Sequence, residues 1–312
     1  MRFSITLVAT DRGPRVADIA RAVEELGLDG LWIPDHTHIP VSRDSPYPLG
    51  GELPDRYRRN LEALSAVAMA AAATSRIRVG TGVLLAALRD PIVTAKALAT
   101  IDQQSGGRVA VGVGYGWNRE EMLDHRVDPA TRRARTREHV LAMRNLWERE
   151  IAGYDGRFVS IAPSWSWPKP AQRPLPVLVG GAATRVVFEH VAEFGAGWIP
   201  VGGHSLPDAV ARLRDRVAVA GRDPDSLEVI PFTSAATGPA KVDALQRAGA
   251  TEIAFDVSAE DEAHSRRALD RVAAFVATRR AYRYLHGVAP EVSNELLDNK
   301  GHRSADGHAP KR

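Results

Sequence analysis

The chain has 312 residues, of which 44% are hydrophobic and 25% are charged, and its net charge is +3. This composition is that of a globular protein, and the absence of cysteine excludes disulfide scaffolds, thiolate nucleophiles, zinc ribbons and iron–sulfur clusters. The 36 Arg and 5 Lys alternate with Asp and Glu along the expected helices. We therefore expect solvated charged faces and no nucleic-acid binding.

Residues 1–14 contain neither a long apolar core nor a small-residue cleavage site, so we expect no signal peptide. The most apolar stretch, 63–73, is too short to cross a hydrocarbon layer of ~30 Å. Together with the absence of cysteine, these features predict a cytoplasmic protein with no membrane partner.

Short runs rich in Val and Ile alternate with segments of helical period along the chain. The runs predict strands at 3–9, 30–34, 77–84, 109–113, 176–179, 197–201, 227–232 and 252–257. The segments between them predict helices at 15–26, 61–73, 92–104, 132–149, 184–194, 207–220, 239–248 and 260–279. The nearly all-apolar strands are typical of a parallel sheet covered on both faces. Eight such units predict the α/β class and a (β/α)8 TIM barrel, with an open doubly wound sheet as the alternative.

Three stretches interrupt this alternation. Residues 37–60 follow the second strand and residues 151–175 follow the fourth long helix, and both are rich in Pro. Loops of this length are usually functional, so we expect both insertions to cover the barrel mouth. The polar residues 282–312 predict a weakly ordered tail after a barrel domain at 1–281.

Barrel enzymes carry their active sites at the carboxyl ends of the strands. The second strand is followed there by Asp35 and His36. A neutral imidazole can give or take a proton near pH 7, and the adjacent Asp35 could orient it. A histidine in a surface loop with no role is the alternative. His38 lies close by, but no third ligand is near, so we expect no metal.

Several predicted strand ends are rich in glycine. Gly180 and Gly181 lead directly into a helix, whose free N–H groups suit a phosphate. Glycine also lets the backbone approach a ligand closely, although tight turns would account for it as well. The spacing of Gly112, Gly114 and Gly116 does not fit the dinucleotide fingerprint G-x-G-x-x-G. Together, these strand ends favour a flat, planar ligand.

Four segments carry a resemblance to a known family. They are SRIRVGTGVLL at 75–85, RDP at 89–91, LATIDQQSGGR at 98–108 and GVGYGW at 112–117. They resemble the luciferase-like monooxygenase superfamily, and in particular its actinobacterial branch of coenzyme F420-dependent oxidoreductases. The resemblance covers residues 1–280. It implies a (β/α)8 barrel, a flavin or deazaflavin held at the mouth, and a homodimer.

The resemblance also implies roles for particular residues. Asp35 and His36 match the pair that contacts the cofactor ring, with the histidine as proton donor or acceptor. The expected cofactor-binding residues are Thr81, Gly82 and Val83 on a strand-three bulge with a non-prolyl cis peptide, Gly114, Tyr115 and Gly116 near the ring and ribityl chain, and Gly180, Gly181 and Ala182 as the phosphate loop.

One position departs from the family. A sugar-phosphate dehydrogenase subgroup carries Glu where this chain has Trp117, which weakens that assignment. Glu120 and Glu121 are close in sequence, but we expect a helical turn to point them elsewhere.

The resemblance predicts hydride transfer between coenzyme F420 and a small organic substrate, with the substrate unidentified. A reduced-FMN monooxygenase on the same barrel is the alternative among enzymes. A non-catalytic ligand-binding barrel is the alternative from another class.

Overall fold

The computed structural model describes residues 1–203, 205–258 and 260–285. The chain divides into two compact units, Met1–Ala274 and Phe275–Arg312. The predicted tail at 282–312 lies almost entirely outside the described residues, so its separation from a domain at 1–281 stays a prediction. No helix in the described part combines the length and the apolarity that crossing a membrane requires.

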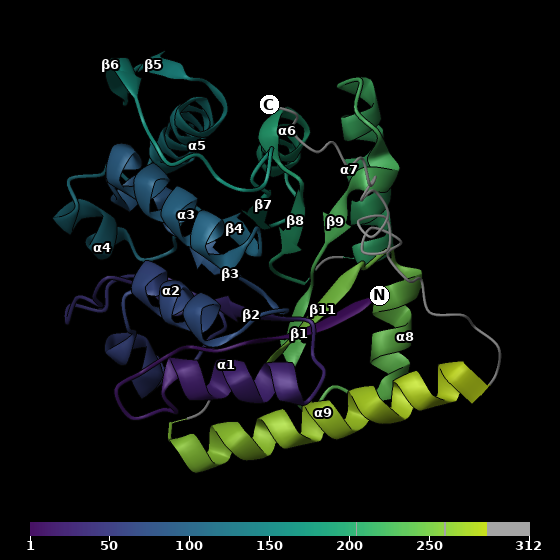
Figure 1. Ribbon diagram of the computed structural model, residues 1–312. Coiled ribbons are helices and arrows are strands. Elements are labelled where there is room, and N and C mark those ends of the chain that lie inside the picture. Colours follow the sequence, from purple (N-terminus) through teal and green to yellow (C-terminus); the bar gives the residue numbers. More distant parts are fainter. Residues whose placement is uncertain (204, 259, 286–312) are drawn as a thin grey trace, which may run out of the picture. The chain divides into compact units, whose positions relative to one another are not determined.

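A sheet of nine parallel strands forms the centre of the first unit (Figure 1). Its spatial order is β10-β11-β1-β2-β3-β4-β7-β8-β9. The strands are β1 Arg2–Thr6, β2 Gly30–Ile33, β3 Arg78–Leu84, β4 Val109–Val113, β7 Val177–Gly181, β8 Gly197–Pro200, β9 Glu228–Val229, β10 Phe232–Ser234 and β11 Glu252–Asp256. The predicted α/β class and the parallel pairing are confirmed.

The two ends of this sheet belong to one short segment of chain. β9 pairs with β8 and β10 pairs with β11, and only Ile230 and Pro231 separate β9 from β10. The sheet therefore curls, and it has the predicted eight strands when β9 and β10 are counted as one interrupted strand. Our single strand at 227–232 is wrong in this detail, since proline has no N–H to donate to a ladder.

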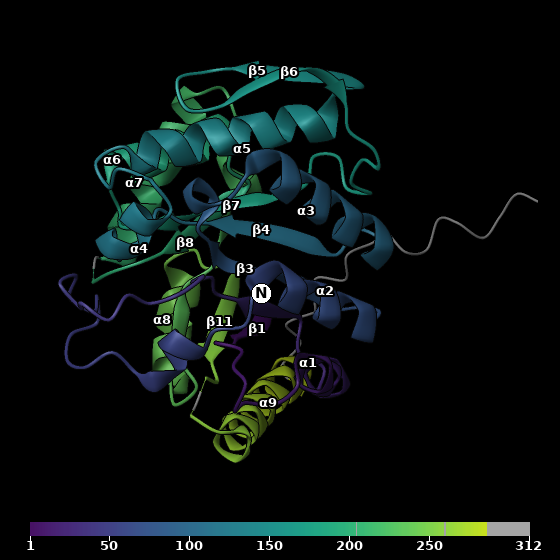
Figure 2. The same ribbon diagram turned by 90° about the vertical axis from the view of Figure 1, so that its left-hand side faces the viewer.

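Helices lie outside the strands (Figures 1 and 2). They are α1 Val16–Glu25, α2 Ala63–Ala73, α3 Pro91–Ser105, α4 Arg119–Asp124, α5 Arg132–Glu148, α6 Arg185–Phe194, α7 Leu206–Val219, α8 Pro239–Arg247 and α9 Glu262–Leu285. Local chemistry sets their ends. Asp90 accepts hydrogen bonds from the first turn of α3, and Gly106 closes that helix in the left-handed conformation. The short helix α4 was not predicted.

The second insertion differs from the prediction. Within 151–175, β5 Ile151–Asp155 and β6 Ser160–Trp165 form an antiparallel hairpin beside α5 (Figures 1 and 2). The chain then returns to the amino end of the sheet, where the Gln172 side chain donates to the carbonyl of Val109. The expectation that this insertion covers the barrel mouth is therefore wrong. The first insertion contains one short 3-10 helix, η1 Asp55–Arg59, and otherwise runs as irregular chain to residue 62.

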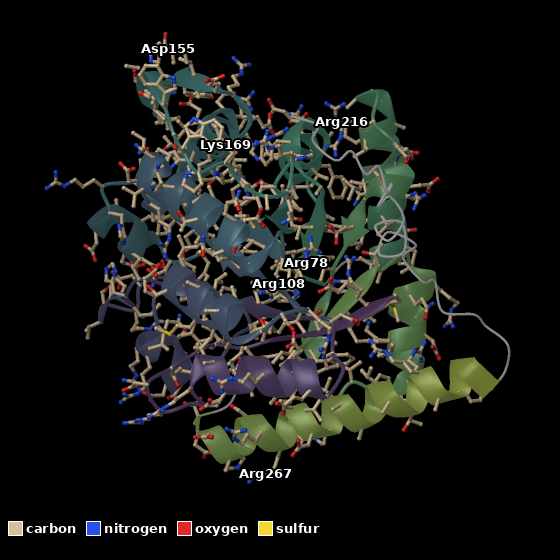
Figure 3. All side chains as sticks on the ribbon, viewed as in Figure 1. Arg78, Arg108, Asp155, Lys169, Arg216 and Arg267 are labelled. Atoms are coloured by element: carbon tan, nitrogen blue, oxygen red, sulfur yellow. The ribbon has the colours of Figure 1, made fainter. Side chains whose placement is uncertain are left out.

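The inside of the curled sheet is filled by apolar side chains. Trp32, Ala110, Leu178, Ile199, Ile230 and Ala254 form one buried cluster, against which the half-buried Val83 and Phe232 pack. At the amino end of the sheet, the Trp32 indole donates to the buried Glu252 at 2.7 Å. Arg78, labelled amid the strands in Figure 3, pairs with Glu228 at that same end. Salt-bridged side chains therefore cover the amino end of the curled sheet.

Candidate active site

The His36 side chain lies just beyond the carboxyl end of β2 and is only 7% exposed. Its Nδ1 lies 2.7 Å from Oε2 of Glu121, and the Trp117 indole donates to its Nε2 at 3.2 Å. An indole nitrogen can only donate a hydrogen bond, so Nε2 carries no proton and Nδ1 does. The network therefore assigns the neutral Nδ1–H tautomer, with Nδ1 donating to the carboxylate.

Glu121 comes from the first turn of α4 and is 1% exposed. Asn118 caps this helix by accepting a hydrogen bond from the Glu121 N–H. The turn directs the carboxylate to the end of β2, where it also accepts from the Thr37 N–H at 3.0 Å. Our expectation that a helical turn would point Glu121 elsewhere is wrong. The spacing of Asn118 and Glu121 is that of a capping box, a helix-start pattern readable from the sequence.

Asp35 has a different partner from the one we expected. Arg89 donates to both of its carboxylate oxygens, at 2.9 and 2.7 Å, and the Leu85 N–H donates to it at 3.0 Å. Burial opposes the charge of Arg89, but its bonds to Asp35 and Glu62 outweigh this effect and raise the Arg89 pKa. Asp35 therefore holds the segment after β3 in place, whereas Glu121 is the carboxylate that orients His36.

Aromatic rings surround His36. Trp117 and Tyr57 meet the imidazole edge-on, with ring centres 5.6 and 5.8 Å away. Tyr47 packs edge-on against both of these rings, and its hydroxyl donates to that of Tyr57 at 3.2 Å. Burial and this hydrogen bond raise the pKa of Tyr57, so its hydroxyl stays protonated. The rings shield the imidazole from water.

Val83 forms an apolar platform at the end of β3. The register shifts between Thr81 and Leu84, and the Gly82–Val83 peptide bond is cis, as the resemblance implied. A Cβ at Gly114 or Gly180 would lie 2.3 or 2.6 Å from the methyl groups of Val83. These two glycines therefore make room for Val83 itself.

Thr81 lies one layer deeper than Val83. Its side chain is fully buried, and its hydroxyl donates to the carbonyl of Gly112 at 2.8 Å. Within the described structure, this hydroxyl thus ties β3 to β4 inside the sheet.

Tyr115 and the phosphate-loop candidates lie together after β4 and β7. The Tyr115 hydroxyl is 2.8 Å from Nδ1 of His190 on α6, and a Cβ at Gly181 would lie 3.4 Å from the Tyr115 ring. Gly116 has a φ of +75°. Ala182 is half-buried before the start of α6, where Thr184 caps the helix.

This geometry agrees with the comparisons to known proteins. The family model described as luciferase-like monooxygenase matches residues 1–300. The chain belongs to the luciferase-like monooxygenase family. An uncharacterised protein of Mycobacterium tuberculosis is 44% identical to this family member over 270 residues, which are 84% of this chain and 95% of that protein.

Relatives with a stated activity are more distant. An F420-dependent glucose-6-phosphate dehydrogenase of Nakamurella multipartita is 32% identical over 241 residues, which are 74% of this chain and 66% of that enzyme. The F420-dependent tetrahydromethanopterin reductase of Methanopyrus kandleri superposes with a TM-score of 0.69 at 18% identity, covering 89% of this chain and 99% of that one. The monooxygenase RslO1 of Streptomyces bottropensis superposes with a TM-score of 0.65 at 23% identity, covering 92% of this chain and 82% of that one. These two structures share the fold.

This family member thus brings together two sets of predicted residues at one edge of its sheet. Gly114 and Gly180 both lie against Val83, and Tyr115 lies beside Gly181. The partners Glu121 and Arg89 were not expected from the sequence, and Trp117 was noted there as a departure from a subgroup that carries Glu. In the described part of the chain, no cluster of three His, Asp or Glu side chains is arranged to hold a metal.

Proposed function

We propose that this protein is an oxidoreductase that transfers a hydride between coenzyme F420 and a small organic substrate at the carboxyl end of its sheet. The observation that carries the proposal is the buried His36–Glu121 pair, with Nδ1 of His36 bonded to Glu121 and Nε2 unprotonated. A neutral imidazole with a buried carboxylate behind it is suited to accept and return a proton.

The residues at this edge fit a planar tricyclic cofactor. Val83 and Phe232 are half-buried apolar side chains next to the strand ends, and they can pack against a flat ring. The chain from Gly181 into α6 can hold a phosphate at the helix start, as the family resemblance implies. A bound deazaflavin would supply the hydride acceptor or donor at its central ring.

The side chains of this protein would handle the proton. Nε2 of His36 takes the proton of an alcohol as it is oxidised, or returns one in the reverse direction. Glu121 acts as a positioning residue, since it holds the tautomer and stabilises the imidazolium that forms. Trp117 must release Nε2 for this step, because its indole occupies that lone pair.

We also propose that the enzyme acts in the cytoplasm as a homodimer.

A reduced-FMN monooxygenase is the second candidate, favoured by the description of the matching family. Such an enzyme needs the same site for a planar cofactor ring and a pocket closed to water. A non-catalytic ligand-binding barrel is the third, and it predicts binding without turnover.

Equilibrium titration of the purified protein with F420 and, separately, with FMN tests the proposal. We expect F420 to bind more tightly, and a panel of alcohols and activated alkenes to show turnover without oxygen. Oxygen-dependent product with reduced FMN and no F420 binding would overturn the proposal. Tight F420 binding without turnover of any substrate would instead favour the non-catalytic alternative.

A further inference from the structure

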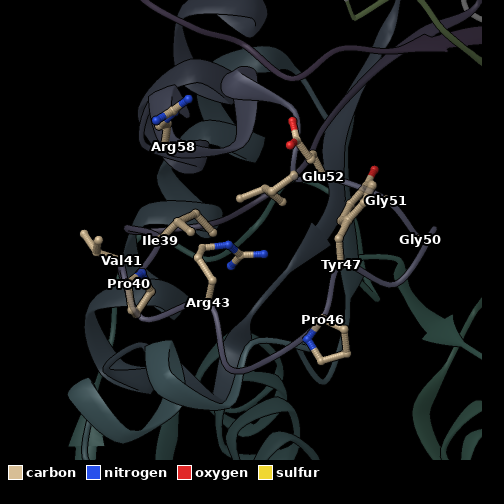
Figure 4. Close-up of a pocket in the computed structure, with 11 residues that line it drawn as sticks. Ile39, Pro40, Val41, Arg43, Pro46, Tyr47, Gly50, Gly51, Glu52 and Arg58 are labelled. Atoms are coloured by element: carbon tan, nitrogen blue, oxygen red, sulfur yellow. The ribbon is translucent and has the colours of Figure 1, made fainter.

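The first insertion encloses a pocket of its own beside the His36 site. The pocket has a volume of about 560 Å³, and Figure 4 shows the side chains around it. Its lining consists of Ile39, Pro40, Val41, Arg43, Pro46, Tyr47, Gly50, Gly51, Glu52, Leu53 and Arg58. Most of these residues are apolar, so the pocket suits an organic molecule with few polar groups.

One cation in this pocket, Arg43, has a buried nitrogen that finds no hydrogen-bond acceptor among the described residues. The Arg43 guanidinium extends into the space between Ile39 and Tyr47 (Figure 4), and its Nη1 is buried without a hydrogen bond. The Glu120 carboxylate is close enough for the charge of Arg43 to help lower its pKa, but its Oε2 is also buried without a hydrogen bond, so it does not serve as the acceptor. A buried guanidinium nitrogen without an acceptor is unfavourable, and a bound oxyanion would satisfy it.

The other cation of the pocket is already paired. Nε of Arg58 lies 2.5 Å from Asp55, and the Arg58 side chain is largely exposed. Glu120, the carboxylate on α4 closest in sequence to the site, accepts a hydrogen bond from the Ser45 N–H at 2.7 Å. Arg43 is therefore the cation of the pocket that can still take an acceptor, although Glu120 offsets part of its charge.

Two contacts place the pocket next to the His36 site. The Arg43 guanidinium carbon lies 5.8 Å from the centre of the Trp117 ring, whose nitrogen donates to His36. Tyr47 lines the pocket and packs edge-on against Trp117. Arg43 and the imidazole thus contact the same indole, which makes the pocket and the His36 site neighbours.

We propose that this pocket binds the carboxylate end of the substrate, with the carboxylate on Arg43 and an apolar body along Ile39, Pro46 and Tyr47. The substrate class is therefore an apolar organic acid whose reactive carbon lies beyond its carboxylate, toward His36. That this molecule is a substrate rests on the proposed function, whereas the binding site itself does not.

Calorimetric titration of the full-length protein without cofactor tests the site. The probes are 4-phenylbutyrate, its neutral amide and inorganic phosphate. We expect the amide and phosphate each to bind at least about tenfold more weakly than the acid, because the amide lacks the charge and phosphate lacks the apolar body. Equal affinity for acid and amide would overturn the proposal, and equal affinity for acid and phosphate would overturn the organic-acid class.

Arg43→Gln should reduce acid binding at least about tenfold and leave amide binding within about twofold. Arg43→Lys keeps the charge but loses the planar fork, and it should reduce acid binding severalfold, even if Arg43→Gln does not fold. Arg21→Gln removes an exposed guanidinium paired with Asp18 and serves as the matched control. Unchanged acid binding in both Arg43 variants would overturn the site, while F420 binding reports separately on the proposed function.

Discussion

Two buried glutamates lie at opposite ends of the same sheet, and their partners differ. Glu252 at the amino end accepts from Trp32 at 2.7 Å, Ser4 at 2.6 Å and Arg2 at 2.8 Å. Glu121 at the carboxyl end accepts from the Thr37 N–H and lies 2.7 Å from the His36 imidazole. A guanidinium keeps its charge at every accessible pH, whereas an imidazole can gain and lose a proton. The first arrangement is suited to fixing strands, and the second to exchanging protons.

The neighbouring Glu228 supports this interpretation of the amino end. Burial would raise its pKa, but Arg78 and Arg2 outweigh burial and lower it. The salt bridges of Arg2 and Arg78 with Glu228 and Glu252 therefore join the starts of β1, β3, β9 and β11.

His36→Ala should give the largest effect. Loss of the proton donor or acceptor should lower the kcat of the folded variant by about 10²–10⁴-fold. Steady-state assays with the substrate that the wild-type enzyme uses fastest measure this change. His38→Ala is the matched control, because His38 is an exposed imidazole paired with Asp124. A decrease of only a few-fold for His36→Ala would remove His36 from the chemistry.

Glu252→Gln should act on stability alone. It leaves the charge of Arg2 and the donor Trp32 next to an uncharged amide in a buried position, which should reduce the free energy of unfolding by about 3 kcal/mol. Urea unfolding measures this loss. The kcat of the folded variant should stay within about twofold of wild type, and a large decrease in kcat would show that the two ends are coupled.

Glu121→Gln should lower kcat about tenfold with little change in KM, because a charge-assisted hydrogen bond of about 1.5–3 kcal/mol is weakened as the imidazolium forms. Asp124→Asn removes an exposed carboxylate from the same helix and is the matched control. If both variants lose activity equally, the effect reflects the charge of α4 rather than the bond to His36.

We expect the smallest effect at His139, which forms no salt bridge with a carboxylate among the described residues. His139 is buried, its Nδ1 bonds the Ala86 carbonyl at 2.9 Å, and burial lowers its pKa below the ordinary 6.5. The unfolded chain therefore takes up a proton on this group at a higher pH than the folded protein does. Its contribution to stability is complete above about pH 6.5 and is lost as the pH falls toward the folded pKa.

Urea unfolding of wild type and His139→Gln across this pH range measures that contribution. The variant should lose stability less steeply as the pH falls. Equal slopes in the two proteins would show that His139 titrates normally in the folded state.

The sequence was sufficient for what depends on local pattern. The strands of the sheet, the long helices and His36 at the end of β2 could be predicted because apolar runs and caps are local, whereas the bulge at Gly82–Val83 was expected from the family resemblance. The hairpin within 151–175 was missed because its strands are mostly exposed and carry no apolar run. Glu121 was missed because it meets His36 across 85 positions, and only the start of α4 brings the two together.

The most direct test of the proton-exchange site is the ¹⁵N NMR spectrum of the imidazole of His36 in protein labelled at histidine, near pH 8, with His36→Gln to assign the signals. We expect that Nδ1 carries the proton and that Nε2 is unprotonated. A proton on Nε2 with Nδ1 unprotonated would contradict the bond to Glu121 and the proton-exchange role built on it.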